Sequence, residues 1–171
     1  MTRTLVAGLG NIFEGDDGFG VAVVQRLFDR TWPEGVEVRD YGIRGVHLAY
    51  QLLDGYDLVV IVDAVARDGE PGTLYVIDHA ADRALAAVEG APMLDAHDLN
   101  PDAVLALVPE LGGTLGRVVI VGCQPATLSP GMELSTAVAG SVERAAQLVT
   151  DIVQRAYADD NEPAIDTVGG A

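Results

Sequence analysis

The chain has 171 residues, and its 26 acidic against 10 basic side chains give a formal net charge of −16 at pH 7. This charge excludes a basic face for nucleic acid phosphates or for an anionic membrane surface, so we expect neither partner. Hydrophobic residues make up 49% of the sequence, which is enough for one folded domain with its own core. Residues 1–158 are therefore predicted to form a single α/β domain, followed by an acidic, frayed tail at residues 159–171.

Cysteine content and the first residues of the chain indicate a cytoplasmic protein. The one cysteine, Cys123, has no partner for an internal disulfide, which is typical of a reducing compartment, and its place in an apolar run predicts a small buried side chain. The first apolar run is only a few residues long and leads into glycines, so it indicates a strand rather than a signal peptide. No segment approaches the roughly 18 apolar residues that span a bilayer. We expect a monomer in the cytoplasm.

Apolar strands and amphipathic helices alternate along the first half of the chain. A continuous apolar run predicts a strand at Thr4–Gly8 that is covered on both faces, and helical spacing of apolar residues predicts a helix at Gly18–Arg30. Alternating residues predict a strand nearer the sheet edge at Val36–Tyr41, and a short helix at Val46–Leu53 is closed by Gly55. This alternation is typical of an α/β fold.

The second half of the chain continues this pattern up to a C-terminal helix. The clearest buried strand is Asp57–Val65, and residues 79–96 are assigned no element. Asn100-Pro101 begins a helix, because asparagine caps helices and proline suits the first helical position. Ser135 caps the longest helix, which is predicted to run to about Tyr157. Two further strands are predicted at Thr73–Ile77 and Arg117–Cys123.

This order of elements predicts a three-layer α/β/α sandwich around a twisted, largely parallel (mixed) sheet. Ligands of such sheets bind beyond the carboxyl ends of the strands. Asp63 ends the clearest buried strand and Asp17 follows the loop after the first strand, so we expect both carboxylates at this edge. Because Asp16 is adjacent to Asp17, one of the two is expected to cap a helix, which leaves the other for a different role.

An imidazole near these carboxylates would complete a metal-binding set. Asp17, Asp63 and His97 offer two oxygens and one nitrogen, which leaves coordination positions open, as a working metal site requires. His97 has flanking aspartates that would orient its ring. His79 follows a predicted strand and is also expected to reach this edge, so spacing alone does not choose between the two histidines.

Other familiar sites are excluded by the residues they lack. Gly8-Leu9-Gly10 follows a strand, but Phe13 replaces the third glycine of a dinucleotide fingerprint, and the acidic pair stands where a pyrophosphate would lie. The sequence contains neither the Gly-x-Ser-x-Gly elbow of serine hydrolases nor the His-Glu-x-x-His motif of zinc proteases. A hydrolytic function would therefore use a different design.

Several motifs, taken in order, resemble those of the [NiFe]-hydrogenase maturation endopeptidases. The resemblance runs from about Thr4 to Val153 and includes His97 ahead of a capped helix. Its other motifs are Gly8-Leu9-Gly10-Asn11 with Asp16-Asp17-Gly18-Phe19-Gly20, Asp40-Tyr41-Gly42, Ile61-Val62-Asp63-Ala64, and Gly122-Cys123-Gln124-Pro125 with Leu134-Ser135. A sandwich of the phosphorylase/hydrolase-like kind is the fold that this resemblance implies.

The resemblance also implies an activity and a set of site residues. Members of the family remove the C-terminal extension of a [NiFe]-hydrogenase large-subunit precursor after nickel insertion. Nickel carried by that substrate would be the recognition signal, and no tightly held metal of the enzyme's own is expected. The family's metal-binding and catalytic positions fall on Asp17, Asp63 and His97, which favours His97 over His79.

A second loop is linked to substrate recognition in this family. It commonly reads Asp-Gly-Gly, and here it reads Asp40-Tyr41-Gly42, so Asp40 and Gly42 are assigned to recognition and Tyr41 to a change in the accepted large subunit. Two alternatives stay open. One is a nickel-dependent checkpoint or chaperone that binds the large subunit without cutting it. The other is a small-molecule enzyme of the nucleoside phosphorylase type, which the acidic edge disfavours.

Overall fold

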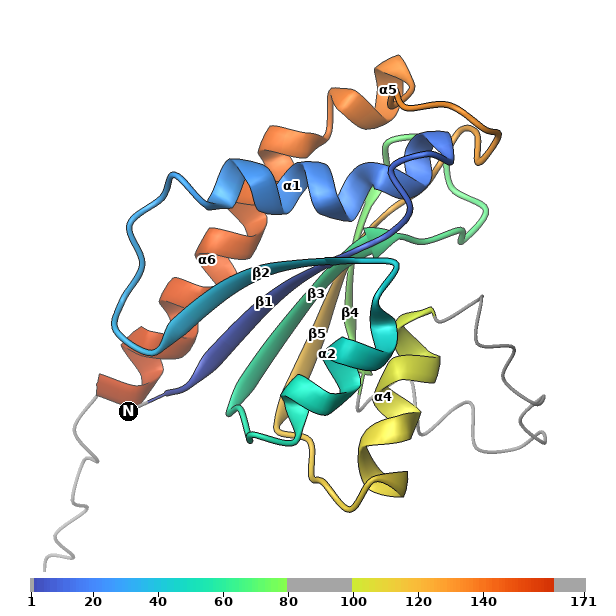
Figure 1. The fold of residues 1–171 in the computed structure, drawn as a ribbon. Helices are drawn as coiled ribbons and strands as arrows, with labels where there is room; N and C mark the ends of the chain where they lie inside the picture. Colours follow the sequence, from blue (N-terminus) through green and yellow to red (C-terminus); the bar gives the residue numbers. More distant parts are fainter. Residues whose placement is uncertain (1, 80–99, 162–171) are drawn as a thin grey trace, which may run out of the picture.

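The computed structural model describes residues 2–79 and 100–161, which form a five-stranded mixed sheet with helices on both faces (Figure 1). The strands are β1 (Thr4–Leu9), β2 (Val36–Gly42), β3 (Leu58–Ala64), β4 (Leu74–Asp78) and β5 (Arg117–Cys123). Their order across the sheet is β2-β1-β3-β5-β4, with β4 antiparallel to β5 and the other pairs parallel. The predicted mixed, largely parallel sheet is confirmed, and every strand lies within one residue of its predicted bounds.

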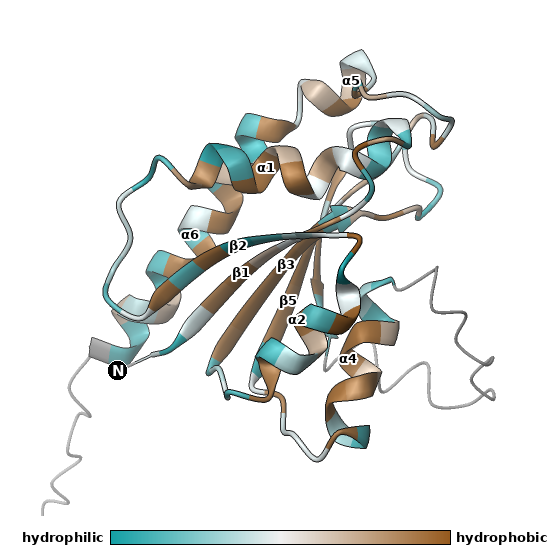
Figure 2. Ribbon diagram, in the orientation of Figure 1, coloured by the Kyte–Doolittle hydropathy of each residue, from teal (hydrophilic) through white to brown (hydrophobic). Residues whose placement is uncertain are grey.

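Helices cover both faces of the sheet and make the three predicted layers. One face is covered by α1 (Phe19–Leu27) and α6 (Val142–Asn161). Each of these follows a short helix, η1 (Gly15–Gly18) before α1 and α5 (Thr136–Ala139) before α6. The other face is covered by α2 (Gly45–Leu52) and α4 (Pro101–Glu110). The central strands are hydrophobic along their length (Figure 2). In β1, Leu5 and Ala7 pack toward α2 and α4, whereas Val6 packs toward α1 and α6. Burial on both faces explains the continuous apolar runs of these strands.

The predicted long C-terminal helix is in fact two helices. Its start is confirmed, because the Ser135 Oγ accepts a hydrogen bond from the Val138 N–H at 3.4 Å. The chain then breaks between α5 and α6, where the Ser141 hydroxyl lies 2.6 Å from the Gly72 carbonyl oxygen and donates to it. This tertiary bond fastens the break to the turn before β4. At its other end α6 continues to Asn161, beyond the predicted end near Tyr157.

The antiparallel direction of β4 removes one alternative for the metal-binding histidine. Leu74 pairs with Cys123 at the carboxyl end of β5, and Asp78 pairs with Val119 nearer its amino end. His79 therefore leaves the sheet away from the edge where Asp17 and Asp63 were expected. Its Nδ1 instead lies 3.6 Å from the Asp102 carboxylate of α4. The prediction that His79 also reaches the carboxyl edge is wrong, because it assumed a strand parallel to the others.

Three further expectations can be compared with the structure. The predicted cap of α4 is confirmed, since the Asn100 Oδ1 accepts a hydrogen bond from the Ala103 N–H at 2.9 Å. Cys123 is fully buried at the end of β5, as predicted for a small apolar side chain. Among residues 2–79 and 100–161, no helix is both long and apolar enough to cross a membrane.

A close approach between α1 and the sheet positions the loops that carry the candidate site. A Cβ atom on Gly20 would lie 2.3 Å from the Leu9 carbonyl oxygen at the end of β1 and 2.1 Å from the Val62 carbonyl oxygen of β3. A Cβ on Gly8 would lie 2.7 Å from the Gly20 carbonyl oxygen. Only glycine fits at such contacts, so the start of α1 packs directly against the carboxyl ends of β1 and β3.

We predict that Gly20→Ala lowers the free energy of unfolding by about 3 kcal/mol, because the methyl group would overlap two backbone oxygens that are fixed by the sheet. Gly140→Ala is the matched control, since its Cβ would meet its nearest atom, the Thr136 carbonyl oxygen, at 3.4 Å. That variant should change the free energy by less than about 0.5 kcal/mol. Urea denaturation followed by circular dichroism compares the two. Equal stabilities would contradict the close packing of α1.

Candidate functional site

Asp17 and Asp63 lie together at the carboxyl edge of the sheet, as predicted. Asp17 is in η1, directly before α1, and Asp63 is the penultimate residue of β3. Gly10 passes between them with φ of 131°, a conformation that favours glycine. A Cβ on Gly10 would lie 1.8 Å from the Asp17 carbonyl oxygen and 3.6 Å from the Asp63 Oδ1. The loop after β1 thus brings the two acidic residues into one small region.

Asp63 is a carboxylic acid in an environment that disfavours its charge. Its side chain is at the end of an apolar strand and the residue is only 7% exposed. Burial is the main cause that raises its pKa well above the usual value, and the nearby Asp17 charge raises the pKa further. The Ala64 N–H donates to its Oδ1 at 2.8 Å and opposes this shift only in part. A proton or a cation would relieve such a group.

Asp17 is less enclosed and is held by a single bond among the described residues. It is half-buried, and its Oδ2 accepts a hydrogen bond from the Asn11 N–H at 2.7 Å. This bond fixes the carboxylate against the Gly10-Asn11 turn without surrounding it with donors. Asp17 therefore retains acceptor capacity beside Asp63.

Asp16 has a different role from its neighbour. It is fully buried, and neither η1 nor α1 has a side-chain cap, so the predicted capping of this helix is wrong. The Asp16 carboxylate instead accepts hydrogen bonds from the Ser135 N–H at 2.7 Å and the Ser135 hydroxyl at 2.9 Å. The N–H groups of Ala126 and Thr127 donate to it at 2.8 and 3.1 Å. These partners are more than 100 residues away in the sequence, so no local pattern predicts them.

Backbone hydrogen bonds join the same two loops. The Gly15 N–H donates to the Gly131 carbonyl oxygen at 2.8 Å, and the Gly131 N–H donates to the Phe13 carbonyl oxygen at 2.8 Å. The Asp16 N–H also donates to the Thr127 carbonyl oxygen at 3.0 Å. The loop between β5 and α5 is thus fastened to the loop that carries Asp17.

The predicted recognition residues are connected to the same turn. The Asp40 Oδ1 accepts a hydrogen bond from the Gly42 N–H at 2.8 Å, and Gly42 has a φ of 51°. The Gly42 carbonyl oxygen in turn accepts from the Gly10 N–H at 2.9 Å. Asp40 and Gly42 therefore shape the end of β2 next to the residue that separates Asp17 from Asp63. Tyr41 leaves this turn in the other direction, and its side chain enters the core that α2 covers.

The third predicted metal ligand lies outside the described residues, because His97 falls within residues 80–99. Within the described ranges no three His, Cys, Asp or Glu side chains gather as a metal-binding cluster. Two of the three predicted ligands, Asp17 and Asp63, lie within the described residues. Their chemistry suits a divalent cation, since Asp63 combines burial with a repelling neighbour. The assignment of His97 stays a prediction.

We predict that Asp16→Asn lowers the free energy of unfolding by about 3 kcal/mol at pH 7, because an NH₂ group replaces an oxygen that accepts hydrogen bonds. Burial alone would raise the pKa of Asp16, but the bonds from Ser135, Ala126 and Thr127 outweigh burial and lower it. The carboxylate therefore stabilises the fold above its usual pKa of 3.8, and this contribution is lost as the pH falls through the lower pKa of the folded state. Urea denaturation from pH 7 to pH 2 tests this. A constant difference across that range would contradict it.

We predict the opposite sign for Asp63→Asn, which should raise the free energy of unfolding by about 1 kcal/mol at pH 7. The raised pKa of Asp63 means that ionisation costs stability in the folded state. This cost is absent below the usual pKa of 3.8, grows as the pH rises from there toward the raised pKa of the folded state, and is constant above that pKa. Thermal unfolding at pH 4 and pH 7 measures it, with the exposed Asp29→Asn as control. A loss of stability at pH 7 would contradict the unfavourable burial of this charge.

Comparisons with known proteins place the chain in a family. The family model described as HycI, hydrogenase maturation protease, matches residues 21–152. The chain is 33% identical over 143 residues to the hydrogenase expression/formation protein HupD of Rhodobacter capsulatus, an alignment that covers 82% of this chain and 66%, just under two thirds, of HupD.

Solved structures with the same fold include hydrogenase-maturing peptidases. The hydrogenase maturating endopeptidase HybD from Escherichia coli superposes with a TM-score of 0.75 at 29% identity, over 90% of this chain and 93% of HybD. The hydrogenase 2 maturation peptidase from Thaumarchaeota archaeon SCGC_AB-539-E09 superposes with a TM-score of 0.66 at 33% identity, over 89% of this chain and 98% of that structure. Since the family model spans more than half of the sequence, the chain belongs to the hydrogenase maturation protease family.

Proposed function

We propose that this peptidase removes a C-terminal extension from the large-subunit precursor of a [NiFe]-hydrogenase. Membership of the maturation protease family supports the substrate class. The observation that carries the proposal is the Asp17–Asp63 pair, which lies at the carboxyl edge of the sheet with one member buried and held at a raised pKa. Parallel α/β sheets bind their ligands at this edge.

Nickel held by the precursor is the proposed recognition signal. Asp17 and Asp63 would contribute carboxylate oxygens and His97 an imidazole nitrogen, and this set alone leaves an incomplete shell. Ligands from the substrate would complete the coordination, so a loaded precursor binds more tightly than an empty one. The enzyme then holds no tightly bound metal of its own. A divalent ion at this position supplies polarisation of a carbonyl group or activation of a water molecule.

The chain's own cysteine is not suited to nucleophilic attack. Cys123 is fully buried, and burial raises the pKa of its thiol to about 11. A thiolate at neutral pH therefore forms rarely, and substrate does not reach it. This supports hydrolysis by a positioned water molecule rather than through a cysteine intermediate.

Intact-mass spectrometry tests the proposal with the cognate large-subunit precursor in nickel-loaded and nickel-free forms. We expect loss of a C-terminal peptide from the loaded form alone. Asp17→Asn and Asp63→Asn should each lower the cleavage rate at least about a hundredfold, as expected for removal of a group at the reacting atoms. The exposed Asp29→Asn is the control for a change of one charge and should cleave normally.

The other outcomes decide between the alternatives. Stable association with the loaded precursor and no mass loss would favour a checkpoint that does not cut. Equal cleavage of loaded and empty precursor would contradict nickel as the signal. Normal cleavage by both aspartate variants would exclude the carboxylate pair from the reaction.

A further inference from the structure

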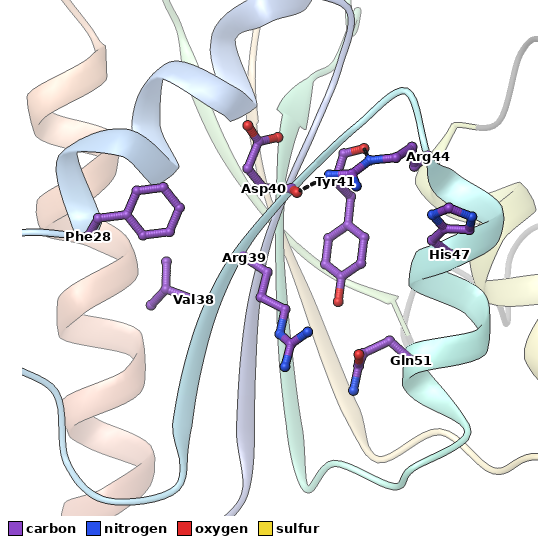
Figure 3. A pocket seen from close by; sticks show the side chains of 8 residues that line it. All are labelled: Phe28, Val38, Arg39, Asp40, Tyr41, Arg44, His47 and Gln51. Atoms are coloured by element: carbon purple, nitrogen blue, oxygen red, sulfur yellow. Dashed lines mark hydrogen bonds between the residues drawn. The ribbon is translucent and has the colours of Figure 1, made fainter.

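An open pocket of about 640 Å³ surrounds β2 and is separate from the carboxylate pair (Figure 3). Phe28 and Val38 line it on the face of the sheet that α1 and α6 cover. Arg39, Tyr41 and Arg44 line it on the face that α2 covers. The pocket thus has walls on both faces of one strand. This shape suits an extended chain, whose side chains point alternately to the two faces of a sheet.

β2 is the last strand of the sheet on this side, with β1 as its neighbour among the described strands. The Thr4 N–H donates to the Gly35 carbonyl oxygen at 3.0 Å, which places the odd-numbered residues in the ladder with β1. The even-numbered residues of β2 therefore direct their backbone groups outward. Val38 and Asp40 present N–H groups along the pocket, and an unpaired strand edge of this kind accepts an additional strand.

The pocket gathers cationic donors in an acidic protein. The Arg44 guanidinium donates to the carbonyl oxygens of Asp40 at 2.8 Å and Tyr41 at 3.2 Å, and within the described ranges it forms no ion pair. Arg39 uses its Nε and Nη2 to bind the Glu37 carboxylate, which leaves its Nη1 unused in the described structure. The Asp40 carboxylate lies on the opposite face of β2 from Arg39 and Tyr41, where its Oδ1 accepts from the Gly42 N–H. The remaining donors of the pocket thus suit a carboxylate.

A buried hydroxyl in the pocket wall has no partner among the described residues. Tyr41 is 6% exposed, and its Oη forms no hydrogen bond to residues 2–79 or 100–161. Figure 3 shows the ring directed toward the end of the pocket where Arg39 and Gln51 lie. Burial raises the pKa of Tyr41 to about 12, so the group is a neutral hydroxyl donor at physiological pH. Buried polar groups are almost always paired, so an unpaired donor in a pocket wall indicates a missing acceptor.

We propose that this pocket binds an extended segment of the precursor as an additional strand on the outer edge of β2. An acidic side chain of the segment bonds to the Tyr41 Oη and to the free donors of Arg39 and Arg44. The backbone of the segment pairs with the outward N–H and carbonyl groups of Val38 and with the N–H of Asp40, whose carbonyl oxygen already accepts from Arg44. This inference rests on the proposed function and names the substrate feature that the enzyme reads besides nickel.

The geometry connects this pocket to the carboxylate pair. β2 ends at Gly42, whose carbonyl oxygen is bonded to the Gly10 N–H, and Gly10 lies between Asp17 and Asp63. A strand along β2 therefore leads toward the candidate site. Val38 and Gly42 are four residues apart, or roughly 13 Å at 3.3 Å per residue. The residue of the segment that pairs with Val38 is thus expected at least about four residues from the scissile bond.

The first test is cleavage of the nickel-loaded precursor by the full-length enzyme with KM and kcat measured separately. Tyr41→Phe and Arg44→Gln should raise KM about tenfold each and leave kcat unchanged, since they remove binding groups remote from the reacting atoms. Arg117→Gln is the control, because Arg117 is also an exposed arginine of the sheet and lies outside the pocket. Tyr41→Phe should not destabilise the free protein, because its hydroxyl has no partner to lose.

Two variants of Val38 test whether the segment pairs with the backbone of β2. Val38→Pro removes an outward N–H that the sheet does not use, whereas Val38→Ala keeps that N–H and removes comparable packing. KM should rise at least tenfold for Val38→Pro relative to Val38→Ala. Wild-type KM values for Val38→Pro, Tyr41→Phe and Arg44→Gln would overturn the inference and leave the proposed function intact.

A binding measurement separates failure of the inference from failure of the function. Overlapping 12-residue synthetic peptides that cover the last 40 residues of the precursor are titrated into isotope-labelled full-length enzyme, each beside a twin with Asp and Glu changed to Asn and Gln. We expect the amide signals of Val38 and Asp40 to shift when one acidic peptide is added. The dissociation constant from these shifts should be at least about tenfold lower for that peptide than for its neutral twin. Equal affinity for the twins, or shifts elsewhere only, would overturn the inference even if the precursor is not cleaved.

Discussion

The close approach of α1 to the ends of β1 and β3 is the constraint on which the site depends. Gly20 lies against the carbonyl oxygens of Leu9 and Val62, so η1 has to end directly above the carboxyl edge of the sheet. Gly10 then passes between Asp17 and Asp63 with no space for a side chain. Two carboxylates from distant segments are held together by backbone packing rather than by attraction between their side chains. The fold therefore holds two carboxylates that repel each other, and a bound cation would reduce this repulsion.

Neighbouring aspartates in this site show how the number of donors decides the state of a carboxylic acid. Asp16 is fully buried, yet three backbone N–H groups and one hydroxyl lower its pKa. Asp63 is nearly as buried but receives a single N–H bond, and its pKa is raised. Asp16 is thus a permanent anion that fastens the loop between β5 and α5. Asp63 is an acid whose negative charge the fold leaves almost uncompensated, and this is the property that the proposed function requires of it.

Local pattern was enough to predict most elements and to place two of the three predicted site residues at one edge of the sheet. Continuous apolar runs marked the strands, and strand ends placed Asp17 and Asp63 at one edge because parallel strands share their carboxyl side. The direction of β4 was not predictable in this way, since it follows from pairing with β5, a strand far along the chain. The break before α6 depends on the Ser141–Gly72 bond, and the role of Asp16 depends on residues 126–135. These features arise from tertiary contacts, which a sequence pattern does not record.

Hydrogen bonds and packing fix the end of β2 in the free protein, and this lowers the entropy cost of the proposed peptide binding. The Arg44 N–H donates to the Tyr41 carbonyl oxygen at 2.8 Å, its guanidinium holds the Asp40 carbonyl oxygen, and the Tyr41 ring is anchored in the core. Ordering this surface on binding therefore costs little, and the entropy cost of association falls on the incoming peptide. The Tyr41 ring packs in the core beneath α2 and carries a hydroxyl donor, and glycine at this position would supply neither. A single side chain thus contributes to both the shape and the chemistry of the edge that adjoins the carboxylate pair.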